Sequence, residues 1–174
     1  MKTLTVLLAG LSLVMGSGMA TAASVSAGIS DLVLSPQHPS GSLIASITAV
    51  GNGGRLRRLG LGVLQYADTQ RVLPPVTVTG GFAETTPQPF VFQGLAYDFT
   101  PTLTDDLTGA GDFIGVEAVS TLLSGGVDVV AGAGLMRIDV TLGPGWEPGV
   151  YGARITFLEL YDENDERFTI DALT

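Results

Sequence analysis

The stretch LMRIDVTLGPGWEPGVYGARITFLEL, residues 135–160, decides the fold class of this chain. In its first half Met136, Ile138 and Val140 share one parity, and charged or polar residues occupy most of the positions between them. This two-residue period is typical of a half-buried β-strand, because successive side chains leave opposite faces of the pleat. The Gly- and Pro-rich residues 143–149 then predict a turn. The stretch therefore predicts a long antiparallel hairpin at the centre of a β-sandwich.

The returning half of this stretch changes parity. Tyr151, Ala153, Ile155 and Phe157 fall on one face, and the apolar positions then shift by one residue, to Leu158 and Leu160. A shift of one residue exchanges the two faces of a strand, so it indicates a β-bulge or a change of sheet.

Other strand-like segments recur along the chain with Gly, Pro, Asn or Asp between them, whereas patterns with helical spacing are poor. The predicted strands are residues 24–34, 42–50, 55–66, 72–79, 90–99, 113–119, 127–131 and 168–173. This organisation predicts an all-β fold, an immunoglobulin-like antiparallel β-sandwich of about eight or nine strands, with a barrel as the alternative.

The N-terminus has the pattern of a secretory signal peptide. Met1 and Lys2 give a short positive region, residues 4–15 an apolar run, and residues 20–22 (Ala-Thr-Ala) a small-residue cleavage pattern. We expect a signal peptide over residues 1–22 and one β-sandwich domain over residues 23–174. The protein is then secreted to the periplasm, cell surface or exterior, with no membrane span after cleavage.

Composition narrows the classes of partner. The chain has no cysteine, which excludes disulfides and Cys-based metal or redox chemistry. Its formal net charge of −9 disfavours nucleic acid as a partner. The basic cluster of Arg55, Arg57 and Arg58 is compatible with binding a carboxylate or a neighbouring copy, and equally with a solvated strand end.

The sequence predicts no catalytic residue and no cofactor. His38 is the single histidine and lies in a Pro-flanked turn, and no Ser lies in a G-x-S-x-G motif. Paired carboxylates hydrolyse glycosides in some enzymes, but the candidates here form no motif. These candidates are Asp105, Asp106, Glu117, Asp128 and Glu159. We therefore predict that the protein is not an enzyme.

The acidic run Asp162–Glu166 is the one candidate for hard-cation ligands. It lacks the Gly and the bidentate Glu that an EF-hand loop needs at its sixth and twelfth positions. We predict no metal site; a weak Ca²⁺ site at this turn is the open alternative to a solvated turn.

Two further features suggest contact surfaces. Trp146, the single tryptophan, lies in a Gly- and Pro-rich loop, where it is either an anchor for carbohydrate or protein or a plug over the core. Gly60 and Gly62 alternate with Leu59, Leu61 and Val63, which leaves one side of that strand thin. Such a strand allows another group to approach its backbone closely.

Two regions together resemble the immunoglobulin-like domains of bacterial pilus systems, both pilins and the N-terminal domains of pilus chaperones. One is LVLSP at 32–36 followed by the strand that ends in an Asn-Gly turn, 42–53, and the other is EPGVYGARITF at 147–157. The chain departs from chaperones in length and in lacking an Arg in its first strand. It departs from many pilins in lacking a disulfide.

The resemblance implies a function in assembly. Residues 24–34 would pair with the sheet edge of a neighbouring subunit, with Val25, Ala27 and Ile29 filling alternate pockets, and such head-to-tail contacts give filaments. The alternative is that this segment is the first strand of a self-contained monomer. We expect an exported, non-enzymatic structural subunit of the cell surface or of a fibre, which associates with itself or with another exported protein. A chaperone-type or carbohydrate-binding module is the competing interpretation.

Overall fold

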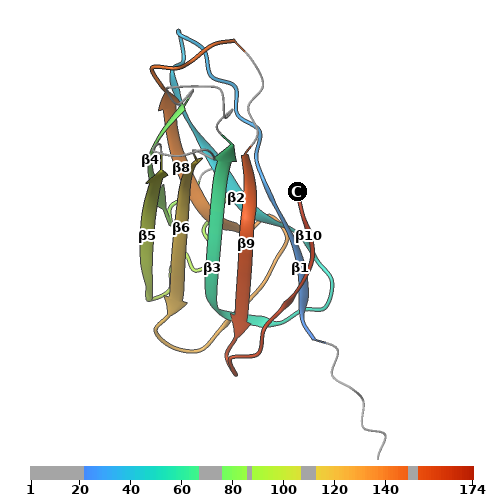
Figure 1. Cartoon of the computed structure of the whole chain (residues 1–174). Helices are drawn as coiled ribbons and strands as arrows, with labels where there is room; N and C mark the ends of the chain where they lie inside the picture. The colour runs from blue at the N-terminus through green and yellow to red at the C-terminus, as the bar shows by residue number, and fades with distance from the viewer. Residues whose placement is uncertain (1–21, 67–75, 86–87, 107–112, 149–152) are drawn as a thin grey trace, which may run out of the picture.

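The computed structural model describes residues 22–66, 76–85, 88–106, 113–148 and 153–174. They form two stacked five-stranded sheets (Figure 1). The first sheet has the order β10 (Thr169–Leu173), β1 (Ser24–Ile29), β2 (Ser40–Val50), β8 (Gly134–Leu142), β4 (Val76–Phe82). The second runs β5 (Tyr97–Asp106), β6 (Phe113–Leu122), β3 (Arg55–Tyr66), with both β7 (Val127–Asp128) and β9 (Ala153–Asp162) paired to β3.

The predicted fold class is confirmed, with two differences in detail. The described residues contain ten strands, rather than eight or nine. The sandwich is not wholly antiparallel, because β1 pairs in parallel with β10, with Ser24 opposite Thr169. The predicted signal peptide lies outside the described residues except for Ala22, and no helix of the described part is long and apolar enough to cross a membrane.

The prediction of a central hairpin at 135–160 is wrong. β8 pairs with β2 and β4 in the first sheet, whereas β9 pairs with β3 in the second, so the two strands belong to different sheets (Figure 1). Each strand has one apolar face, and the alternation reports that face correctly. It does not report the hydrogen-bonded neighbour, because strands paired in one sheet and strands stacked across two sheets bury their apolar faces equally well.

The predicted bulge in the returning strand is confirmed. Gly62 lies opposite Phe157 and Val63 opposite Ile155, so β9 has one extra residue at this point. Ile155 and Leu158 therefore both point into the core, whereas Phe157 lies on the outer face of the sheet. The assignment of Phe157 to the same face as Ile155 is wrong for this reason.

The aromatic segment 90–99 is also not the strand that its composition predicted. Phe90 and Phe92 lie in a turn before β5 and are 3% and 0% exposed. Their rings meet edge to face, with 5.6 Å between the ring centroids. β5 begins at Tyr97 and continues to Asp106, beyond the end of the predicted strand 90–99. Aromatic residues are common in strands because they pack well, and here the same packing fills the sandwich from a loop.

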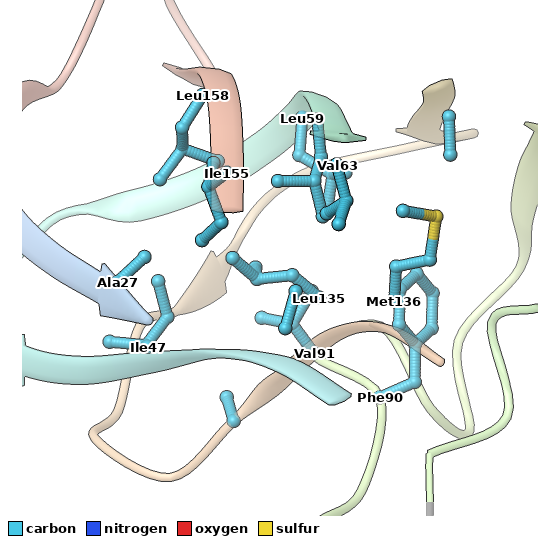
Figure 2. Close-up of a cluster of buried hydrophobic side chains, with 14 of the residues drawn as sticks. Ala27, Ile47, Leu59, Val63, Phe90, Val91, Leu135, Met136, Ile155 and Leu158 are labelled. Atoms are coloured by element: carbon cyan, nitrogen blue, oxygen red, sulfur yellow. The ribbon is translucent and has the colours of Figure 1, made fainter. Parts of the chain in front are cut away.

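Apolar side chains from both sheets fill the space between them. Figure 2 shows Ala27 and Ile47 of the first sheet across from Leu59, Ile155 and Leu158 of the second. The core also contains a cavity of about 10 Å³, comparable to the space one water needs. Its lining is apolar: Leu43, Val63, Val78, Val116, Ile138, Val140 and Ala153. This gap is too small to hold an organic substrate.

A candidate binding face on the second sheet

The outer face of the second sheet is the candidate functional site. The register aligns its outward side chains in three rows across β5, β6, β3 and β9, which lie side by side in Figure 1. We call these twelve residues the open face: Asp98, Thr121, Arg58 and Tyr161; Thr100, Val119, Gly60 and Glu159; Thr102, Glu117, Gly62 and Phe157.

A phenylalanine lies against a glycine pair in the middle of the open face. A Cβ on Gly62 would be 2.6 Å from Cδ1 of Phe157 and 2.7 Å from Oγ1 of Thr156. A Cβ on Gly60 would be at an ordinary distance, 3.6 Å, from the same ring. The expected close approach to this strand's backbone is thus confirmed, and the approaching group is the ring of Phe157 on the neighbouring strand.

One end of the open face has internally paired charges. The guanidinium carbon of Arg58 is 4.0 Å from the ring centroid of Tyr161, and an Arg58 Nη lies 3.7 Å from Asp165. Arg167 pairs with Glu159 at 3.3 Å, and the Tyr161 hydroxyl donates to the same carboxylate at 3.4 Å. Arg58 therefore covers a face of the Tyr161 ring, which makes that face unavailable for stacking on a ligand.

The rest of the open face is exposed. Val119 is 52% exposed, and the register aligns it with Thr100 on one side and Gly60 on the other. Asp98 and Glu117 are exposed in the rows above and below. The face therefore offers a flat, weakly apolar centre with threonine hydroxyls and carboxylates around it.

The three arginines of the basic cluster separate in the structure. Arg55 donates to the Gly126 carbonyl at 2.7 Å and pairs with Glu163 at 3.2 Å. The Nε of Arg57 is buried, and it has no hydrogen-bond partner among the described residues. Arg58 belongs to the open face. The cluster in the sequence is therefore not one basic patch on the surface.

In the acidic turn after β9, the carboxylate oxygens accept hydrogen bonds within the turn or pair with arginines of this chain. Oδ1 of Asp162 accepts from the backbone N–H groups of Asn164 at 2.8 Å and Glu166 at 2.9 Å. Desolvation raises the pKa of Asp162, but these bonds and one from the Asn164 side chain lower it more, so the pKa lies below its ordinary 3.8. Glu163 and Asp165 pair with arginines. Within the described ranges, no three possible ligands converge on a metal position.

The other candidates for chemistry are dispersed. His38 is exposed in a tight turn, where its backbone N–H donates to the Ser35 carbonyl at 2.9 Å. Asp105 and Asp106 end β5, and Asp128 lies on β7. Glu117 and Glu159 do share the open face, on either side of β3. Glu159 is already paired with Arg167.

The residues predicted to make interactions lie elsewhere. Val25 and Ala27 are fully buried in the chain's own core, and Ile29 packs against that core. β1 pairs with β2 on one side and β10 on the other. Trp146 is half-buried in the loop after β8, where its backbone N–H donates to the Gly143 carbonyl at 3.1 Å. None of these four residues is part of the open face.

Sequence reasoning noticed one part of the open face and missed the rest. The sequence predicted that Gly60 and Gly62 leave one face of their strand without side chains. The alternation of Thr100 and Thr102 in β5, and the polar parity of β6, were available signals. They were missed because residues 100–112 lie outside the predicted strands and because a register across four strands has no local signature.

Comparison with known proteins shows the fold and no family. No protein-family model matches the chain, and the search of curated proteins found no significant match. Among solved structures, the chain is similar to a cohesin module from a Clostridium perfringens family 33 glycoside hydrolase. The match has a TM-score of 0.52 and 9% sequence identity, and it covers 88% of this chain and 93% of that chain. The likeness supports the β-sandwich architecture.

Proposed function

We propose that this protein is an exported, non-catalytic β-sandwich module that binds another exported protein through the open face. The predicted signal peptide supports export to a surface or extracellular location. One solved structure with a similar fold is described as a cohesin module of a glycoside hydrolase, which is consistent with a modular role for the fold. The observation that carries the proposal is the exposed, flat centre of the open face.

The shape and chemistry of the open face favour a protein as the ligand. Small-molecule sites are concave and enclose most of the ligand, whereas this face is a sheet surface with an exposed valine at its centre. Sugar binding on a flat surface needs an aromatic ring with a free face. Arg58 covers a face of Tyr161, and Phe157 packs against the glycines of β3.

Charge favours a different protein over a second copy of this one. Asp98 and Glu117 are exposed on the open face, and the whole chain has a formal net charge of −9. Two copies meeting through this face would bring like charges together, which opposes association. A partner with basic side chains around a small apolar centre fits the face, and its association rate should fall as salt rises.

Assembly by strand addition is the second candidate function, and it requires a larger structural change in the molecule. β1 would have to leave both of its neighbours and withdraw Val25 and Ala27 from the core. Fibres of the purified mature protein in electron micrographs, lost when residues 24–34 are deleted, would favour this candidate. Loss of the fold in the same deletion would instead show that β1 serves its own sandwich.

Affinity capture with matched surface variants tests the binding proposal. The bait is the mature chain, the source is the exported protein fraction of the same cells, and Val119→Arg is the open-face variant. Thr77→Arg, at an exposed position of β4 on the outer side of the first sheet, is the control. We expect a captured protein that is lost with Val119→Arg and retained with Thr77→Arg. Equal capture by both variants would contradict the proposal.

A further inference from the structure

The turn between β2 and β3 holds the beginning of β1. The Ser24 N–H donates to the Asn52 carbonyl at 3.0 Å, and the Gly51 N–H donates back to the Ser24 carbonyl at 2.9 Å. Asn52 also donates from its backbone to Oγ of Ser24 and from its side-chain amide to the Ala22 carbonyl, each at 3.3 Å. We call this set of contacts the Asn52 clamp.

The residue after Asn52 leaves the clamp open to a specific reaction. Gly53 is exposed, and a Cβ at this position would meet no atom within 4 Å. Within the part of the chain that the structure describes, the Gly53 N–H donates no hydrogen bond. Its nitrogen is therefore accessible, and the absence of a side chain allows the backbone rotation that brings this nitrogen toward the Asn52 side chain.

We propose that Asn52 is a site of spontaneous deamidation that alters the clamp. The Gly53 nitrogen loses its proton and attacks Cγ of Asn52, which forms a C–N bond and releases the side-chain nitrogen as ammonia. Water then opens the resulting five-membered imide at one of its two carbonyls. The products are aspartate, with the backbone unchanged, and isoaspartate, in which the backbone passes through the former side chain. One water is consumed for each ammonia released.

The other asparagine provides an internal comparison. Asn164 precedes Asp165, whose N–H already donates to the Asp162 carbonyl at 3.2 Å. The side-chain amide of Asn164 donates to Oδ2 of Asp162 at 3.3 Å. Both asparagine side-chain amides donate at 3.3 Å, so the difference lies in the attacking nitrogen. The Asp165 nitrogen is held in the acidic turn, and Asp165 has a Cβ that Gly53 lacks. Asn164 should remain intact while Asn52 reacts.

Deamidation should loosen the start of β1. A carboxylate at position 52 has lost the donor that reaches Ala22, and it adds negative charge to a turn that already lies near Asp171. Oδ2 of Asp171 would be 3.2 Å from a Cβ on Gly51. Isoaspartate additionally inserts a methylene into the backbone of the turn, which displaces the carbonyl that accepts from Ser24. The expected result is faster amide exchange at Ser24 and Gly51.

Peptide mass spectrometry of the folded mature protein, aged at mildly alkaline pH, tests the proposal. We expect the amide-to-acid mass change at Asn52, an isoaspartate signal there, and none at Asn164. The control is Gly53→Ala, which the free space at this position accommodates and which should lose the reaction. Asn52→Gln provides a second unreactive control. Conversion at Asn164 as fast as at Asn52, or undiminished conversion in Gly53→Ala, would overturn the proposal.

Hydrogen–deuterium exchange on the same aged sample tests the structural consequence. Aged wild-type protein should exchange faster at Ser24 and Gly51 than fresh protein, while aged Gly53→Ala should match its fresh form. Conversion of Asn52 without any change in exchange at these two amides would overturn the link between the reaction and the clamp.

Discussion

The outer faces of the two sheets differ in how they use their polar groups. On the first sheet, Ser42 donates to Asp139 at 2.7 Å, and Arg137 donates to the same carboxylate through Nε at 3.0 Å and an Nη at 3.2 Å. Arg137 also lies over the Phe82 ring, 4.8 Å from its centroid. These side chains bond to one another, so the polar groups of this face largely have partners within the face itself.

On the second sheet, the described residues at the centre of the outer face form no such network. Glycines occupy the central part of β3, Phe157 packs on them, and Val119 and Glu117 are exposed between these glycines and the threonines of β5. A face that has already satisfied its polar groups gains little from a partner, because each new bond replaces an existing one. The contrast is consistent with the proposal that the second face is the recognition surface.

The largest effect is expected from removing the central carboxylate of the first face. Asp139→Ala leaves Arg137 and Ser42 without their partner in a half-buried position. We expect a loss of about 2 kcal/mol in the free energy of unfolding, measured by urea denaturation. Glu117→Ala on the open face is the matched control and should change stability by less than about 0.5 kcal/mol. Equal losses in both variants would remove the distinction between the faces.

The glycine pair provides the next test. Gly62→Ala places a methyl group against the Phe157 ring and should destabilise the fold by about 1 kcal/mol, because the ring must move. Gly60→Ala meets the same ring at an ordinary distance and should be neutral or slightly stabilising. Thermal denaturation of the two variants measures the difference. A neutral Gly62→Ala would show that Phe157 does not pack on the glycine.

A smaller effect is expected at the charged end of the open face. Arg58→Ala removes the contact with Tyr161 and the ion pair with Asp165, both on the surface. We expect a loss of about 0.5–1 kcal/mol in urea denaturation, and Arg58→Lys should recover only part of it, because lysine lacks the planar group. Full recovery by lysine would show that charge, rather than stacking on the ring, makes the contribution.

The smallest effect concerns the acidic turn. The pKa of Asp162 is lowered on folding, so its charged form stabilises the fold above its ordinary pKa of 3.8, and this contribution disappears as pH falls through the lower folded value. The stability difference between wild type and Asp162→Asn should be constant near neutral pH and shrink below pH 3.8. The exposed Asp128→Asn serves as a control. A difference that grows on acidification would contradict the assigned direction.

Particular residues show how far the sequence predicts this fold. The alternation of Met136, Ile138 and Val140 and the parity change after Phe157 predicted half-buried strands and a bulge, because side-chain direction is a local property of the backbone. The partner of each strand was not predictable in this way. β8 and β9 lie in different sheets, and only the packing of the whole chain selects this arrangement over a hairpin.

The candidate site was less accessible to prediction than the fold. Trp146 and the segment Val25–Ile29 were chosen because their residue types are common in interfaces, whereas Val25 and Ala27 pack in the core. The open face consists of ordinary residues, among them threonine, valine and glycine, whose significance comes from their alignment across four strands. Such an alignment depends on register, which no single segment of the sequence specifies.

Site-specific photo-crosslinking tests the central claim most directly. A photoreactive amino acid is placed at position 119 of the open face, or at position 77 on the outer side of the first sheet, and the protein is irradiated among the exported proteins of its own cells. The account predicts a crosslinked partner from position 119 and none from position 77. A partner crosslinked from position 77 alone would contradict it.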